Sequence, residues 1–141
     1  LQTFFLYLAG ALLGRRLGVL SQIIYVLLGV LGLPVFSGGK AGLGVLMGPT
    51  GGYIIGFIIA AFVIGKLVEM REHPRLPWLV LSMLAGGCIV YTLGILQLMV
   101  VAGLSPIKAL TAGALPFIPG DILKIAAAAA VALKIRERVN F

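Results

Sequence analysis

Charged side chains are scarce in this sequence, and their scarcity decides the class of protein. They make up 11% of the 141 residues, whereas a soluble domain usually carries about a quarter. Hydrophobic residues make up 61%, and they run in long blocks rather than in the one-sided stripes of a soluble amphipathic helix. A soluble globular domain is therefore excluded, and the sequence predicts an all-α integral membrane protein.

Cysteine and histidine each occur once, which excludes several kinds of site. Cys88 lies in an apolar run, so no disulfide can form within these residues, and we expect a small buried side chain. His73 stands alone in a charged loop, which argues against a zinc site of His and Cys ligands. A P-loop needs Ser or Thr after its Gly-Lys pair, but Gly39-Lys40 is followed by Ala41. We expect no metal, no cofactor and no bound nucleotide.

Five apolar segments are candidates for membrane-spanning helices, since a span needs about 20 apolar residues. They cover residues 1–14, 17–33, 50–68, 76–103 and 121–135. Between them lie a glycine-rich loop over residues 34–49 and a broken apolar segment over residues 104–120. Together they predict a single transmembrane domain over residues 1–141.

The basic residues indicate how the spans are oriented, because cytoplasmic loops are enriched in lysine and arginine. The net charge is +7, and eight of the eleven basic residues follow the first, third and fifth spans: Arg15, Arg16, Lys66, Arg71, Arg75, Lys134, Arg136 and Arg138. Alternating spans put all three clusters on one side, which we expect to be cytoplasmic. Lys40, Lys108 and Lys124 fall on the outer side, together with the glycine-rich loop. Basic residues at the ends of apolar blocks also argue against a nucleic-acid partner.

The stretch "GLPVFSGGKAGLGVLMGPTGGY", residues 32–53, contains eight glycines and two prolines. Non-helical backbone at membrane depth is tolerated only where protein buries it or where it lines a cavity. We therefore expect the stretch to fold back over the bundle, either as a wall of a ligand site, where glycine lets the backbone approach closely, or as a structural turn. Small residues at every fourth position predict a helix-packing face over Gly48, Gly52, Gly56 and Ala60.

The segment "PFIPGDILKI" holds Asp121, the only acidic residue expected on the outer side. Asp121 and Lys124 are three residues apart and share one helix face. Ionisable groups at the start of a membrane helix usually mark a functional site. The alternative is that Asp121 caps the helix and that Lys124 pairs with it or extends to solvent. We favour ligand binding, because Asp121 is expected on the same face as the glycine-rich loop.

The motifs "GLPVFSGGKAGLGVLMGPTGGYIIGF" and "LPFIPGDILKI", in this order, resemble the BioY family. Members of that family are the biotin-specific S components of energy-coupling factor (ECF) vitamin transporters in prokaryotes, and "LQTFF" with "GALLG" fits the family's second helix. The resemblance covers nearly the whole chain. It implies a bundle of six helices in the cell membrane that binds biotin with high affinity at its outer side. It also implies two kinds of partner, a transmembrane coupling protein (T component) and two ATPase subunits that bind the ATP.

The resemblance also implies roles for individual residues. Asp121 is expected to accept the ureido N–H bonds of biotin, and Lys124 to donate to the ureido carbonyl or to pair with the carboxylate. A mostly apolar pocket with a few placed polar groups suits such a ligand. The other expected contacts are the backbone of the loop and the walls of the pocket: Phe36, Gly39, Lys40, Gly42, Gly44, Thr50 and Tyr53.

The family's first helix and the loop after it have no counterpart in residues 1–141, so the five spans would be helices two to six of such a bundle. We expect this sequence to be part of a longer chain rather than a natural five-helix variant. Two alternative functions stay open: an S component or secondary carrier for another small vitamin, and, less favoured, a membrane enzyme. An enzyme would need a nucleophile with a base or a metal site, and the outer side offers one carboxylate and no histidine.

Overall fold

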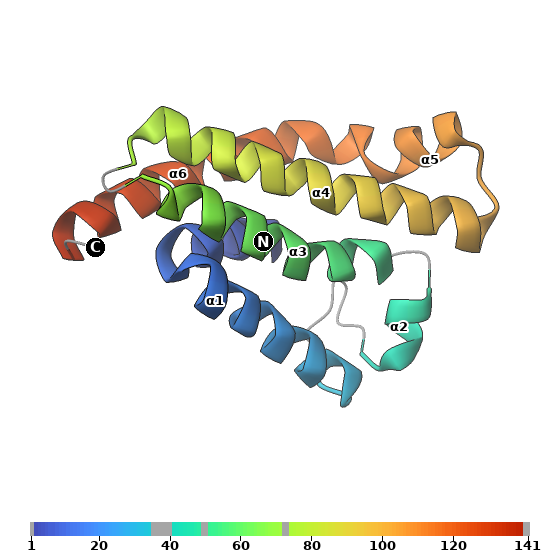
Figure 1. Ribbon diagram of the computed structural model, residues 1–141. Helices are drawn as coiled ribbons and strands as arrows, with labels where there is room; N and C mark the ends of the chain where they lie inside the picture. Colours follow the sequence, from blue (N-terminus) through green and yellow to red (C-terminus); the bar gives the residue numbers. More distant parts are fainter. Residues whose placement is uncertain (1, 35–40, 49–50, 72–73, 140–141) are drawn as a thin grey trace.

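The computed structural model describes residues 2–34, 41–48, 51–71 and 74–139, and every regular element in these ranges is a helix (Figure 1). The elements are α1 (Gln2–Val30), α2 (Leu43–Met47), α3 (Gly51–Glu69), α4 (Leu76–Ala102), α5 (Pro106–Gly113), the 3-10 helix η2 (Leu115–Phe117) and α6 (Ile118–Val139). Four described stretches are long and apolar enough to cross a membrane: Thr3–Val30, Gly51–Glu69, Leu76–Ala102 and Pro106–Arg136. The expected all-α class is confirmed.

Helix α1 is bent into two arms at Gly14, whose backbone has φ 80° and ψ −179°. This φ lies in the left-handed region, which glycine adopts without steric strain. After the bend the chain doubles back, because a Cβ added to Gly18 would lie 3.5 Å from the Cα of Gly10. In a straight helix these two residues would be about 12 Å apart. The two arms, residues 2–13 and 15–30, occupy the places of the spans expected at 1–14 and 17–33.

Helix α3 lies between α1 and α4 (Figure 1), and its small residues let both neighbours approach at backbone distance. A Cβ added to Gly56 would lie 2.9 Å from the Cα of Val90 in α4, and one added to Gly65 would overlap the backbone of Arg15 in α1. Ala60 is fully buried. The expected packing face is therefore confirmed for Gly52, Gly56 and Ala60, whereas Gly48 lies before α3 and ends α2.

Helix α6 packs into the bundle through its alanine run. Ala128, Ala129 and Ala132 have no exposed surface and belong to the same buried cluster as Leu6 of α1 and Met83 of α4. A smooth alanine surface permits this close contact between helices. One side of the run therefore serves packing inside the chain.

Two segments expected to be irregular contain helices. Residues 104–120 include α5, whose N-cap Ser105 accepts the backbone N–H of Lys108 at 3.3 Å and is followed by Pro106 in the first turn. A serine followed by proline is a signal for a helix start. In the loop expected over residues 34–49, residues 43–47 form the short helix α2.

The expectation that Cys88 is buried is wrong. Its side chain is exposed on α4. An apolar run implies burial in a soluble protein, but a helix that is apolar all round also presents apolar residues to lipid. Neighbouring apolar residues therefore did not show which way this side chain faces.

The bundle has two ends, which are formed by different elements (Figure 1). At one end, here called the α2 end, lie α2, the start of α3, the end of α4 and α5. At the other, here called the Gly14 end, lie the bend of α1, the end of α3 and the end of α6. Arg136 of α6 reaches across this second end, where its Nη1 donates to the carbonyl oxygen of Ala11 at 3.0 Å.

Candidate ligand-binding site

Asp121 lies in the first turn of α6 and is the one charged side chain that is buried among those whose burial the structure describes, with 7% of its surface exposed. Tyr7, from the first arm of α1, donates its hydroxyl to this carboxylate. The Tyr7 Oη lies 3.0 Å from Oδ1 and 2.8 Å from Oδ2 of Asp121. Tyr7 itself has no exposed surface. The carboxylate singled out from the sequence is thus held inside the bundle by a tyrosine.

Helix α4 passes close to this pair because it carries a glycine there. A Cβ added to Gly87 would lie 2.9 Å from the Tyr7 Oη and 3.6 Å from the Asp121 Oδ2. Helices α1, α4 and α6 therefore meet at the carboxylate.

Lys124 follows Asp121 on α6 and is partly exposed. The described side chains of Asp121 and Lys124 form no ion pair. The ion pair found among the described residues joins the Arg15 Nε and the Glu69 Oε2, which are 3.5 Å apart. Asp121 also lies inside α6, which begins at Ile118, and not at its N-cap. The interpretation of Asp121 as a helix cap paired with Lys124 is therefore wrong.

Sequence reasoning missed Tyr7, although a signal for it was present. A tyrosine hydroxyl in an apolar run must find a polar partner when it is buried. The sequence also offered one carboxylate on the expected outer side. Which of the four tyrosines meets that carboxylate depends on how the helices are rotated against one another.

Tyr53 lies near the start of α3 and joins three helices. Its Oη donates to the carbonyl oxygen of Gly113 in α5 at 2.6 Å. Its ring packs on the backbone of α4 at Gly94, where an added Cβ would overlap the ring. The ring also meets that of Tyr91 edge to face, with centroids 6.3 Å apart. Tyr53 therefore packs on Tyr91 of α4, and its hydroxyl is engaged by α5.

The glycine-rich loop is described only in part. Phe36, Gly39, Lys40 and Thr50, all expected in the site, lie outside the described residues. Gly42 has φ 94° and its N–H donates to the carbonyl oxygen of Gly29 in α1 at 2.6 Å. A Cβ added to Gly42 or to Gly44 would meet open space. No described contact joins these two glycines to Asp121.

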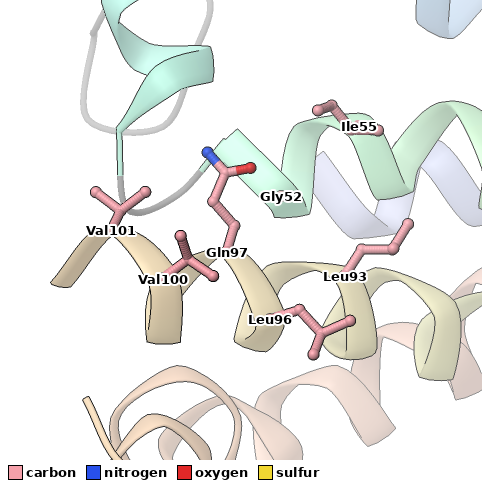
Figure 2. A pocket seen from close by; sticks show the side chains of 7 residues that line it. All are labelled: Gly52, Ile55, Leu93, Leu96, Gln97, Val100 and Val101. Carbon is pink, nitrogen blue, oxygen red and sulfur yellow. The ribbon is translucent and has the colours of Figure 1, made fainter. Parts of the chain in front are cut away.

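Gln97 of α4 ties α2 to the rest of the bundle. Its Nε2 donates to the carbonyl oxygens of Leu46 and Gly48, each at 2.7 Å. Figure 2 shows the amide at the edge of a shallow depression between α3 and α4, which is otherwise apolar and lined by Gly52, Ile55, Leu93, Leu96, Gln97, Val100 and Val101. A ligand site needs placed polar groups, and the amide protons of Gln97 are engaged by α2. We therefore place the candidate site at Asp121 and not in this depression.

The sequence matches the model of the BioY family over residues 1–141. The chain belongs to the BioY family. It is 44% identical over 138 residues to a biotin transporter BioY of Thermotoga maritima. This match covers 97% of this chain and 79% of the relative. It is 43% identical over 136 residues to a probable biotin transporter BioY of Methanothermobacter thermautotrophicus, covering 88% of this chain and 84% of the relative. The family expected from the two motifs is confirmed.

The fold is also similar to a solved structure, the crystal structure of the S-component for biotin from an ECF-type ABC transporter. The TM-score is 0.89 at 29% sequence identity, and the match covers 97% of this chain and 74% of that one. The expected helical bundle of the ECF S-component type is therefore confirmed. The relatives that the chain matches are transporters and not enzymes.

Proposed function

We propose that this chain binds biotin and takes it up across the cell membrane as the substrate-specific component of an ECF transporter. The observation that carries the proposal is the buried carboxylate of Asp121 at the junction of three helices, in a chain whose relatives are named biotin transporters. An ionisable group inside a membrane bundle is expensive and usually functional. Tyr7 uses only part of the acceptor capacity of this carboxylate.

The chemistry of biotin fits the groups around Asp121. Its ureido group carries two N–H donors, and a carboxylate accepts such bonds with the added strength of its charge. Lys124, one turn away and partly exposed, donates to the ureido carbonyl or pairs with the ligand's carboxylate. The rings of Tyr53 and Tyr91 supply apolar walls. Tyr53 contributes its ring rather than its hydroxyl, because the hydroxyl already donates to the carbonyl oxygen of Gly113.

The glycine-rich loop completes the proposed site. Phe36, Thr50 and the backbone around Gly39, Lys40, Gly42 and Gly44 would close over the ligand from the α2 end. Gln97 supports this proposal because it holds α2 against α4 with two hydrogen bonds. A loop anchored in this way has fewer conformations to lose when a ligand is bound.

The orientation in the membrane and the partners are part of the same proposal. The three basic clusters, which contain eight of the eleven basic residues, lie toward the Gly14 end (Figure 1). We assign that end to the cytoplasm, because cytoplasmic ends are rich in lysine and arginine, and the α2 end and Asp121 to the outer side. The T component and two ATPase subunits, which bind ATP, would supply the energy for uptake.

Equilibrium binding tests the proposal directly. Purified full-length protein in detergent is titrated with radiolabelled biotin, and unlabelled biotin, riboflavin and thiamine are added as competitors. We expect saturable binding that biotin displaces and the other two vitamins do not. Displacement by another vitamin at lower concentration than biotin would assign the site to that vitamin, and no binding of any of them would overturn the proposal.

A further inference from the structure

We infer that Tyr7 is a positioning residue of the ligand site, which fixes the Asp121 carboxylate in the orientation in which it accepts the ligand's donors. The inference rests on the proposed function, because it concerns how the same carboxylate is presented to biotin. Tyr7 was not among the residues that the sequence singled out, and it lies on α1, remote in sequence from both proposed ligand-binding segments.

The geometry around Tyr7 leaves its hydroxyl little freedom. Its side chain has no exposed surface, and its Oη lies 3.0 and 2.8 Å from the two oxygens of Asp121. A hydroxyl carries one proton, which is shared here between two acceptors, whereas an ionised carboxylate has about four acceptor positions. Tyr7 therefore leaves most acceptor positions of Asp121 unused.

The surroundings explain why the carboxylate needs a fixed partner. Asp121 is 7% exposed, and a buried polar group that is left without a hydrogen bond destabilises the fold. Gly87 brings the backbone of α4 against the pair and leaves no room for a side chain there. Tyr7 satisfies Asp121 before the ligand arrives and prevents its rotation away from the site. Tyr7 thus acts on the ligand through Asp121, without contacting it.

A double-mutant cycle on biotin binding tests this inference. Tyr7→Phe removes the hydroxyl and keeps the ring, and we expect it to weaken biotin binding about tenfold, or about 1.4 kcal/mol. In a chain that already carries Asp121→Asn, the same change is expected to weaken binding less than about twofold, because a residue that acts through Asp121 is coupled to it. Equal losses in both backgrounds, or no loss with Tyr7→Phe alone, would overturn the inference.

Controls separate positioning from stability. Ser82→Ala also deletes a buried hydroxyl, one that bonds only to the Trp78 carbonyl of its own helix at 2.8 Å, and we expect unchanged biotin affinity. If Tyr7→Phe does not fold, Gly87→Ala replaces it, because the added Cβ would push on the Tyr7 hydroxyl 2.9 Å away. Its expected loss of affinity again disappears in the Asp121→Asn background.

The outcomes also separate this inference from the proposed function. If the unaltered protein does not bind biotin, the proposed function fails and the role given to Tyr7 fails with it. If the unaltered protein binds biotin and Tyr7→Phe binds equally well, the function stands and only the inference about Tyr7 is wrong.

Discussion

The Glu69 carboxylate caps the second arm of α1 at Arg15. Its Oε1 accepts the backbone N–H of Arg15 at 2.9 Å, and its Oε2 lies 3.5 Å from the Arg15 Nε. The bend at Gly14 interrupts the helix, so backbone groups on both sides of it lose their helical partners. Glu69 from α3 satisfies a donor on one side, and Arg136 from α6 satisfies the carbonyl of Ala11 on the other. The bend is therefore secured by two helices that are distant in sequence.

Two substitutions of Glu69 should distinguish what the cap contributes to stability from what the ion pair contributes. Glu69→Ala removes both and is expected to lower the free energy of unfolding by about 1 kcal/mol, as lost caps do. Glu69→Gln keeps an oxygen for the Arg15 N–H and loses only an ion pair that is 42% and 46% exposed, which is worth a few tenths of a kcal/mol. Unfolding of the purified protein in mixed micelles measures both. Equal losses for the two variants would contradict the cap.

Gln97 is expected to control how long the ligand stays bound. Gln97→Leu keeps much of the side-chain volume but leaves the carbonyls of Leu46 and Gly48 without its amide. Two hydrogen bonds contribute about 1 to 3 kcal/mol together, so we expect biotin to dissociate roughly five to 140 times faster. Release of radiolabelled biotin into excess unlabelled ligand measures the rate.

Thr92→Val is the matched control for Gln97→Leu. The Thr92 hydroxyl also lies on α4, but it donates to the Cys88 carbonyl of its own helix at 2.7 Å. Its loss should not change the release rate. A release rate unaltered by Gln97→Leu would show that anchoring α2 has no part in retaining the ligand.

Much of the fold was predictable because lipid imposes simple rules on a membrane chain. Runs of apolar residues must end where charged residues begin, so Arg15 and Arg16 marked the first turn of the chain and the "EMREHPR" segment marked the end of α3. The same rules do not tell which side of an apolar helix faces lipid. The prediction that Cys88 is buried was therefore wrong. Residues 104–120 were expected to be irregular, but Ser105 and Pro106 start α5 there.

The site was predictable only for the residue that is chemically unusual. Asp121 stands out because a carboxylate at the start of a membrane helix is expensive. Its partner Tyr7, the bond of Tyr53 to Gly113 and the two bonds of Gln97 were not assigned from the sequence. Each joins residues on different elements, and the rotation of one helix against another decides whether such groups meet. That rotation follows from packing at glycines and alanines, which the spacing of polar residues does not encode.

Gly94 is expected to be required for stability, because a side chain at this position would not fit. A Cβ at this position would overlap the ring of Tyr53, and overpacking of a tight contact costs about 1 to 3 kcal/mol. We expect Gly94→Ala to lower the free energy of unfolding by that amount. Gly120→Ala is the control, since an added Cβ there meets nothing within 4 Å, and an alanine in a compatible helical site leaves stability equal or higher by about 0.4 to 1 kcal/mol. Similar losses for both glycines would contradict a specific role for the Tyr53 contact.

Asp121 is expected to be the main polar contact of the ligand. Asp121→Asn keeps the size of the side chain but removes its charge and replaces one acceptor oxygen by a donor group, so it should weaken biotin binding at least tenfold, or about 1.4 kcal/mol. Lys124→Met should weaken it as well, because a donor to the ureido carbonyl or to the ligand carboxylate is lost. Lys108→Met removes an exposed cation of α5 at the same α2 end and should leave binding unchanged. Affinity for radiolabelled biotin, measured on variants that elute as folded protein, decides the matter: an Asp121→Asn protein that binds as tightly as the unaltered one would remove Asp121 from the site.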